Sequence, residues 1–511
     1  MAPKRVIIIG GGMAGLSAGT YLRMNGYETT IYEMNATPGG LCTSWQRENY
    51  IVDLCIHFLV GSKPGTGFYE KWNELIDLNE IRFVNHDEYF RMEDGKGKVI
   101  HVYADLDRLE DEFMTQAPED EKEIRRFITG ARKLTGFDML PEDNANWWSQ
   151  MKRMWEVLPF LGTFASFKRY SCRDYSLKFK NPLLRKVIAN LFEPDMSIVF
   201  GMMCLSWFHN RNAGYPVGGS LKFAMKFYER YNELGGQIVL NTKVAKIITE
   251  NNKAIGVELS SGERREADYV VSAADGYTTI FEMLKGWYID EKLLKFYKKA
   301  KTFPSLVFIA FGVRKNFEGW PAMLAFPSPK PVFIDPQTTV SDLCVGIHNY
   351  DPTLAPKGAT LLTVMFETSN HGYWSSLHRD NPGQYNLEKD RISSEIISIL
   401  DQRFGNIRDN VEMVDVSTPE TFKSFTGNWK GSFEGWLMTP ETGFKMLPHT
   451  LTGLGNFYMC GHWVAIGGGL PGVLLSGRET AQAICREDSK QFVIASPVTV
   501  EQEEEEIVNI I

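Results

Sequence analysis

The first 33 residues constrain the fold of this chain more than any other stretch. A short β-branched run, Val6–Ile9, is typical of a buried parallel strand. It leads into Gly10, Gly12 and Gly15, which have the G-x-G-x-x-G spacing of a turn that binds a dinucleotide diphosphate. In such a turn Gly10 permits the tight bend, Gly12 lets a pyrophosphate approach the backbone, and Gly15 lets the following helix pack closely on the strand.

The residues after the glycines complete a strand–helix–strand unit. A helical pattern begins at about Met13 and stops at Asn25–Gly26, and a second strand ends on Glu33. This acid lies 18 residues beyond Gly15, where a carboxylate accepts a hydrogen bond from the ribose 2′-hydroxyl and would repel a 2′-phosphate. The unit predicts an α/β dinucleotide-binding domain, but by itself it does not separate FAD from NAD.

Two later stretches favour FAD. Residues 235–275 alternate apolar and polar in short strands, with turns at Asn251–Asn252 and Ser261–Gly262. Residues 455–487 predict a strand, a glycine-rich loop and a helix that begins near Pro471. The free N–H groups at that helix start would suit the N1/C2=O edge of a flavin, which gains negative charge on reduction.

Composition narrows the class of protein. The chain has 511 residues, 43% of them hydrophobic, and a formal net charge of -8, which indicate a soluble multidomain enzyme and argue against nucleic-acid binding. No apolar run approaches the roughly 18 residues of a spanning helix. The seven cysteines are scattered without a CxxC pair, which predicts free thiols in the cytoplasm and no metal site.

Four stretches carry a resemblance to a known family. They are PGGLCTSWQRENYIVDLCIHFLVG (38–61), GYPVGGSLKFAMKFYERYNELGG (214–236), DPTLAPKGATLLTV (351–364) and GGGLPGVLLSGRETA (467–481). Together they resemble the phytoene desaturase family of FAD-dependent oxidoreductases, which includes carotenoid isomerases and retinol saturases; IHFLVG is similar to the retinol saturases. The resemblance implies an α/β fold, with a Rossmann-like FAD-binding domain of the glutathione-reductase type and inserted helical and strand-rich substrate lobes.

The resemblance also implies residue roles. The diphosphate of FAD would lie on Gly10, Gly12, Ala14 and Gly15, and the adenosine ribose on Glu33. Gly40 and Leu41 would lie along the cofactor, and the backbone of Val244 would meet the adenine. The ribityl chain and the pyrimidine edge would lie by Gly461, Gly469, Gly472 and Val473. Related flavoproteins often place an acid or a small residue after the glycine that matches Gly461, whereas this chain has His462 and then Trp463.

The matched stretches divide the chain into segments. The FAD-binding domain is expected to be discontinuous, over 1–90, 215–290 and 420–490. The insertions are a helical lobe at 91–214 and a substrate lobe at 291–419, which contains the strand-like runs 305–313 and 360–368. The acidic tail, 491–511, is expected to fray.

A basic segment, 147–186, stands apart from this acidic chain. It holds nine lysines and arginines against two acids, a local net charge of +7. On a helix its apolar residues would share one face, a pattern that fits either a helix lying in a membrane interface or a core-facing helix with a solvated back. These residues are Trp147, Met151, Met154, Trp155 and Leu158.

Candidate catalytic groups are few, because the flavin itself would supply the redox chemistry. A proton must also move, so an acid or base beside the flavin is expected. His57 and His462 lie in the flavin-facing stretches and are the candidates, each with a structural hydrogen-bonding role as the alternative. Cys42, Cys55 and Cys460 lie nearby and are interpreted as small buried hydrophobic residues.

The predicted function is an FAD-dependent oxidoreductase that desaturates or saturates carbon–carbon bonds of a lipophilic, polyene- or isoprenoid-like substrate. Three alternatives stay open. They are a non-redox cis–trans isomerase that uses reduced FAD, a flavin amine oxidase, and a lipid-binding escort protein without flavin. Peripheral membrane contact through 147–186 is expected with the lipophilic substrate. The sequence does not indicate the oligomeric state.

Overall fold

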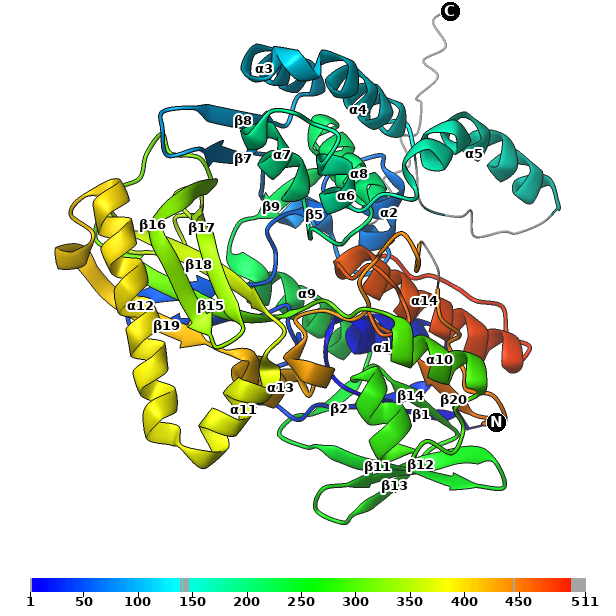
Figure 1. Ribbon diagram of the computed structural model, residues 1–511. Coiled ribbons are helices and arrows are strands. Elements are labelled where there is room, and N and C mark those ends of the chain that lie inside the picture. The colour runs from blue at the N-terminus through cyan, green and yellow to red at the C-terminus, as the bar shows by residue number, and fades with distance from the viewer. Residues whose placement is uncertain (1, 138–139, 141–146, 444–445, 498–511) are drawn as a thin grey trace, which may run out of the picture.

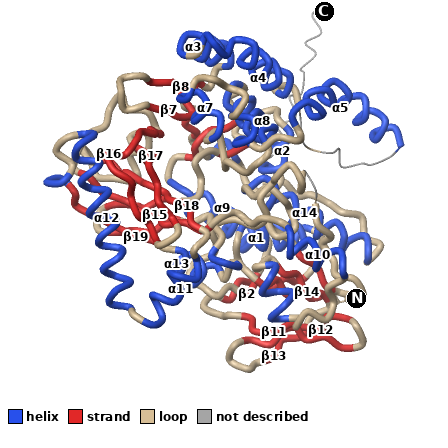
Figure 2. The backbone as a smooth tube through the Cα atoms, viewed as in Figure 1, coloured by secondary structure: helices blue, strands red, loops and turns tan. Residues whose placement is uncertain are grey.

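The computed structural model describes residues 2–137, 140, 147–443 and 446–497, with the side chains of 147–154 and 156 left aside. Three parts are visible in Figure 1: a layered α/β domain, a strand-rich lobe and a helical lobe. Figure 2 shows the separation of the latter two, with strands gathered in one and helices in the other.

The α/β domain is built on a five-stranded parallel sheet. Its order is β10 (Gln237–Val239), β2 (Glu28–Tyr32), β1 (Arg5–Ile9), β14 (Tyr269–Ser272) and β20 (Phe457–Met459). Helices α1 (Met13–Met24), α9 (Gly219–Glu233) and α14 (Leu470–Glu487) cover one face (Figure 1). The strands of this sheet therefore come from three segments that lie far apart in the sequence.

The first strand is buried on both faces, because its side chains alternate between two cores. Val6 and Ile8 pack in the core under α1 and α14, whereas Ile7 and Ile9 pack toward the opposite layer. That layer is the antiparallel sheet β11 (Val244–Glu250), β12 (Lys253–Leu259) and β13 (Arg264–Glu266). The predicted turn at Asn251–Asn252 joins β11 to β12; both residues have positive φ, which asparagine tolerates.

The strand-rich lobe contains a seven-stranded sheet. Its order is β19 (Val411–Ser417), β15 (Ser305–Val313), β18 (Thr360–Thr368), β17 (Thr338–Ile347), β16 (Met323–Asp335), β7 (Glu88–Glu93) and β8 (Val99–Tyr103). Every residue of β15 is buried. One face of the sheet packs against α12 (Pro382–Phe404), which lies beside α11 (His371–Asp380). The other face packs against β4 (Tyr50–Asp53) and α13 (Pro419–Thr426), and β4 is paired with β3 (Ser44–Arg47).

The expected division at residue 91 needs a correction, because it falls inside β7. Strands β7 and β8 extend the substrate-lobe sheet through the parallel pairing of Leu324 with Arg91. Phe90 and Ile100 bury their side chains in the core of the helical lobe. The segment 91–214 is therefore helical only after residue 103.

The helical lobe packs around a single core. Its helices are α3 (Leu106–Gln116), α4 (Glu121–Leu134), α5 (Trp147–Phe167), α6 (Cys172–Ser176), α7 (Pro182–Ala189) and α8 (Ile198–His209). Helix α5 projects from the rest of the lobe (Figure 1). The helical lobe is joined to the α/β domain by the short strands β5 (Leu59–Val60), β9 (Ala213–Pro216) and β6 (Phe83–Val84), near α2 (Gly67–Asn73). In the α/β domain, α10 (Glu291–Lys299) follows β14.

The predicted C-terminal tail, 491–511, is only partly described. The first part of the predicted tail packs on the α/β domain: Asn25 exchanges hydrogen bonds with the Val493 backbone, and the Phe492 ring contacts Tyr21. Residues 498–511, the acidic end of that tail, lie outside the described residues. Among the helices that the structure describes, none is both long and apolar enough to cross a bilayer.

Candidate functional site

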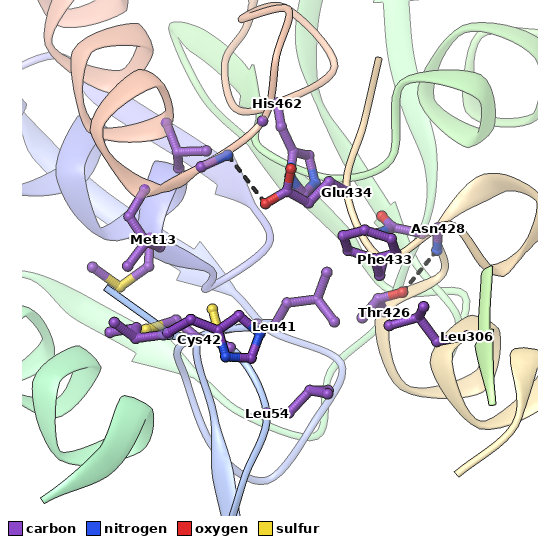
Figure 3. A pocket seen from close by; sticks show the side chains of 18 of the residues that line it. Met13, Leu41, Cys42, Leu54, Leu306, Thr426, Asn428, Phe433, Glu434 and His462 are labelled. Atoms are coloured by element: carbon purple, nitrogen blue, oxygen red, sulfur yellow. Dashed lines mark hydrogen bonds between the residues drawn. The ribbon is translucent and has the colours of Figure 1, made fainter. Parts of the chain in front are cut away.

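A cavity of about 1400 Å³ lies where the three parts meet. It begins at the carboxyl ends of β1 and β2, the edge of a parallel sheet at which ligands bind. It continues between the helical lobe and the seven-stranded sheet. Its volume exceeds the roughly 300–1,000 Å³ of ordinary small-molecule pockets, which suits two ligands in one space. Figure 3 shows part of its wall, where Met13, Leu41 and the neighbours Phe433 and Glu434 come from three separate segments.

The dinucleotide end of the cavity is formed by the loop between β1 and α1. Gly12 is the N-cap of α1 and supplies no side-chain cap, so the first N–H groups of the helix remain available to an anion. The Gly11 N–H donates to Glu33 at 2.7 Å, and the second oxygen of Glu33 accepts from the Asn35 N–H at 2.8 Å. These bonds hold the Glu33 carboxylate, which is buried, at the cavity wall.

The three fingerprint glycines meet different surroundings. A Cβ on Gly15 would collide with the Gly10 carbonyl oxygen, so α1 can cross β1 only with glycine there. A Cβ on Gly12 would meet no atom nearer than 3.8 Å and would point across the gap to Gly40. Glycine at both 12 and 40 keeps side chains out of this part of the cavity wall, as a diphosphate cradle requires, so the residues present fit the group.

The C-terminal glycine-rich loop forms the opposite wall. Gly467, Gly468 and Gly469 all have positive φ, a region that disfavours other residues. Gly469 is the N-cap of the 18-residue helix α14, and its N–H donates to Glu434 at 3.2 Å. A Cβ on Gly468 would overlap the Glu434 carboxyl group, so glycine at 468 makes room for this acid.

Glu434 and His462 are titratable groups beside this loop (Figure 3). Burial raises the pKa of Glu434 to about 7, and the Gly469 N–H opposes the shift. Burial lowers the pKa of His462 to about 4, so its imidazole is neutral near pH 7. A carboxyl group with a pKa near neutrality can both hold and release a proton, as a group that exchanges protons must.

Two buried aspartates connect three of the stretches noted in the sequence. The Tyr215 hydroxyl lies 3.1 Å from an Asp53 oxygen and 3.2 Å from an Asp351 oxygen. The Gly218 N–H donates to Asp351 at 2.8 Å, and the Ser220 N–H donates to Asp53 at 2.9 Å. Burial raises the pKa of Asp53 to about 6. This network ties the α/β domain to the substrate lobe behind the cavity wall.

Histidines gather on the wall next to this network. His57, His86 and His348 all line the cavity, and the charges of His57 and His86 act on His348. Burial, with those two neighbours, lowers the pKa of His348 to about 3. The His57 side chain is accessible from the cavity, yet the surrounding protein lowers its pKa as well.

A pair of acids, Glu193 and Glu367, lies in the cavity wall toward the helical lobe. Burial raises the pKa of both carboxyl groups, and the negative charge of Glu367 raises that of Glu193 further. The charge of Glu434 also acts on Glu193. This part of the wall therefore carries protons rather than full negative charge near pH 7.

The structure brings nearly all the predicted site residues to one cavity. The exception is Gly15, which supports the helix crossing and does not line the cavity. Residues that do line it are Gly10, Gly12, Ala14, Glu33, Gly40, Leu41, His57, Val244, Gly461, His462, Gly469, Gly472 and Val473. Sequence reasoning missed Glu434, His86 and the pair Glu193 and Glu367, because none lies in a motif. His348 could have been noticed, since it precedes the stretch that begins at Asp351.

Comparisons with known proteins agree with this geometry. The family described as flavin containing amine oxidoreductase matches residues 13–485. Prolycopene isomerase 2 of an Oncidium hybrid cultivar is 25% identical over 92% of this chain and 82% of its own length. The 1-hydroxycarotenoid 3,4-desaturase of Flavobacterium sp. is 26% identical over 94% of this chain and 99% of its own. Cyclohexylamine oxidase of Brevibacterium oxydans shares the fold, with a TM-score of 0.59 at 14% identity over 96% and 100% of the two chains.

Proposed function

We propose, from the premise that this chain belongs to the family of flavin containing amine oxidoreductases, that it adds or removes two hydrogens at a carbon–carbon bond of a lipophilic polyene or isoprenoid-like substrate. The observation that carries this proposal is the single cavity that joins the dinucleotide cradle to a long apolar chamber. The relatives support it, because one is named as a carotenoid desaturase and another as a carotenoid isomerase.

The wall of the chamber favours a hydrocarbon chain over a small polar substrate. Leucine, methionine and phenylalanine side chains from all three parts of the molecule face it, among them Leu54, Phe58, Leu306, Met323, Met365 and Phe433. Binding of a hydrocarbon chain against such a wall is favourable, because it removes apolar surface from water. A small amine would leave most of this surface unfilled.

The cofactor is FAD, which supplies hydride acceptance or donation when bound. We assign its diphosphate to Gly10, Gly12 and Ala14 at the start of α1, and its ribose to Glu33. The remaining contacts are assigned to Gly40, Leu41, Val244, Gly461, Gly469, Gly472 and Val473. The glycine cradle and the uncapped start of α1 support this assignment.

We assign the proton exchange that accompanies hydride transfer to the wall formed by Glu434 and His462. Glu434 is the stronger candidate, because its pKa of about 7 lets it take up and release a proton near neutrality. His462 is held neutral, so it serves as a hydrogen-bond donor or acceptor rather than as a cation. His57 faces the same cavity and is the second histidine proposed to act in turnover.

Two other chemistries suit part of the structure or of the relatives. A non-redox cis–trans isomerisation with reduced FAD is favoured by the likeness to prolycopene isomerase. A flavin amine oxidase is favoured by the fold shared with cyclohexylamine oxidase. An escort protein without flavin would have no need of the open cradle before Gly12.

We also propose that the protein is cytoplasmic and rests on the inner face of a membrane through α5. Trp155, Leu158 and Leu161 are 65%, 51% and 50% exposed along this helix. Lys168 and Arg169 follow them and are exposed too. An exposed apolar stripe beside basic residues suits an interfacial helix, and a retinol-saturase-like or carotenoid-like substrate would be reached there.

Product mass tests the proposed function. The purified, FAD-loaded protein is incubated without oxygen with a panel of polyenes, and the products are analysed by mass spectrometry beside the flavin spectrum. A mass change of two hydrogens with a matching change in flavin redox state is expected. An isomer of unchanged mass would favour the isomerase, peroxide formed with amines in air would favour the amine oxidase, and a colourless protein would contradict all three.

A further inference from the structure

One face of strand β17 follows the chamber from the surface inward. Asp342, Cys344 and Gly346 of this strand line the cavity, and so does His348 just beyond the strand end. Residues two apart share one face of a strand, and each residue adds about 3.3 Å along it. Asp342 and His348 therefore mark two points of the chamber wall that lie roughly 20 Å apart.

The Asp342 end of this wall reaches the protein surface. Asp342 and Lys186 of α7 both line the cavity, yet their side chains are 41% and 51% exposed. Thr339 and Asn190, which also line the cavity, are exposed as well. His348 at the other end is buried. The chamber therefore opens to the surface between α7 and β17 and ends in the interior at His348.

An ion pair crosses this opening. The Lys186 Nζ atom lies 2.8 Å from one oxygen of Asp342 and 3.0 Å from the other. The two residues are attached to different cores, because Leu184 and Val187 of α7 pack in the helical lobe and Leu343 of β17 packs in the strand-rich lobe. The seam between α7 and β17 can therefore widen without unpacking the interior of either lobe.

The strength of this ion pair suits a closure that opens often. Both partners are half-exposed, and an exposed ion pair is a weak interaction that dissolved salt screens further. Thermal motion breaks such a pair readily. When the pair is formed, it joins the two sides of the opening and leaves the apolar chamber behind it.

We propose, resting on the function proposed above, that the lipophilic substrate enters and leaves the chamber between α7 and β17, and that the Lys186–Asp342 pair is a latch that opens for each passage. A substrate inside the chamber leaves the latch free to close again, so the latch is closed in both the empty and the loaded protein. Breaking it should therefore raise the association and dissociation rate constants together and leave the dissociation constant unchanged.

Stopped-flow fluorescence with a neutral probe tests the latch. The probe is diphenylhexatriene, a rod-shaped polyene that fluoresces in apolar surroundings, and it is mixed with the FAD-loaded protein. Asp342→Asn should raise both rate constants about two- to fivefold, the range expected for loss of one exposed ion pair. Raising the salt from about 0.01 M to about 1 M should speed the wild type but not Asp342→Asn, because the probe itself carries no charge.

Further variants separate the latch from the place of entry. Lys186→Asp should speed exchange, and the double variant Lys186→Asp with Asp342→Lys should return it to the wild-type rate, because the pair is formed again with its charges reversed. Thr339→Trp places a large ring at the opening and should slow both rate constants. Met446→Trp, at another exposed position of the cavity wall, is the matched control and should change neither.

The outcomes distinguish this inference from the proposed function. Unchanged rates in Asp342→Asn, or a double variant as fast as Lys186→Asp, would overturn the latch. Slower exchange in Met446→Trp but not in Thr339→Trp would overturn the place of entry. Each of these results leaves the proposed function standing, whereas a wild type that does not bind the probe would overturn both. FAD content and thermal midpoint of each variant show that the fold is intact.

Discussion

Gly12 and Gly15 belong to one motif, but the structure gives them different physical tasks. Gly15 is required for packing, since any Cβ there meets the Gly10 carbonyl oxygen. A Cβ on Gly12 would meet the Gly39–Gly40 backbone only at ordinary contact distance, so a side chain there is compatible with the fold and would instead displace the cofactor. The two positions therefore allow folding and cofactor binding to be tested separately.

The first prediction is that Gly12→Val gives a folded protein without FAD. The valine side chain would occupy the place of the diphosphate, as measured by the visible flavin absorbance per mole of protein. Gly15→Ala is the comparison: it should lower the thermal midpoint of the protein itself, because α1 must move away from β1. Full FAD occupancy in Gly12→Val would contradict the assignment of the cradle.

The second prediction separates the two candidate histidines. His462 follows Gly461, which is proposed to contact the FAD, so His462→Ala should change the flavin spectrum or its occupancy. His57 is attached to the segment after β4, so His57→Ala should keep the FAD and lower turnover. Wild-type spectra and rates in both variants would mean that neither histidine acts in the reaction.

The third prediction concerns the pH dependence of stability at Glu434. Its folded pKa of about 7 lies above the ordinary 4.5, so between these values the folded state binds more protons than the unfolded state. Stability from this group is therefore present at low pH and is lost as the pH rises from about 4.5 to 7.

Glu434→Gln should remove that loss, so its thermal midpoint should rise relative to the wild type as the pH increases through this window. Glu28→Gln, at an exposed position of β2, is the control. An identical pH profile of melting for the wild type and Glu434→Gln would show that Glu434 is not held in its protonated form.

Among the individual elements, α5 stands out because it projects from its lobe (Figure 1). The predicted apolar stripe is only partly described: Trp155 and Leu158 are exposed, and the side chains of Trp147, Met151 and Met154 lie outside the described residues. The exposed pair favours the interfacial interpretation over a core-facing helix at these two positions.

The fourth prediction tests α5 as a membrane contact. Lys168→Glu with Arg169→Glu should weaken sedimentation with anionic liposomes mainly at low salt, because each basic residue near the surface contributes about 1 kcal/mol that salt screens. Trp155→Ser with Leu158→Ser should weaken it at every salt concentration, since apolar burial is not screened. Trp287→Ser, which removes an exposed tryptophan elsewhere, should have no effect. Wild-type protein that stays in the supernatant at low salt would exclude the contact.

At the scale of the whole molecule, the network of Asp53, Tyr215 and Asp351 holds the α/β domain and the substrate lobe together behind the cavity. One hydroxyl group faces two carboxyl groups, each of them buried. Removing that hydroxyl leaves an Asp53 oxygen without its donor. The effect should grow with pH, because Asp53 is protonated below its pKa of about 6 and charged above it.

The fifth prediction is that Tyr215→Phe lowers the free energy of unfolding by about 1–3 kcal/mol, the cost of an unpaired buried acceptor. The loss should be larger at pH 8 than at pH 5, as measured by urea denaturation. Tyr228→Phe, in the helix α9 that follows β9, is the control and should change the free energy of unfolding little. A pH-independent loss would mean that Asp53 is not the group affected.

Features that depend on local patterns could be predicted from the order of residues alone. The glycine spacing, the β-branched run and the alternating strands were sufficient to predict β1, α1, β2, the turn between β11 and β12, and strands β15 and β18, because periodicity and backbone freedom act over a few residues. The family motifs were sufficient to place thirteen of the fourteen predicted site residues on one cavity wall.

Contacts between side chains that lie far apart along the chain followed from the folded arrangement. Strands β7 and β8 join the substrate-lobe sheet, although they precede it by about 200 residues, because the free edge of β16 accepts them. Glu434, His86 and the Asp53–Tyr215–Asp351 network belong to the site through contacts across lobes, and no spacing along the chain encodes such contacts. Burial in the finished cavity, rather than residue type, then sets whether each acid or imidazole carries charge.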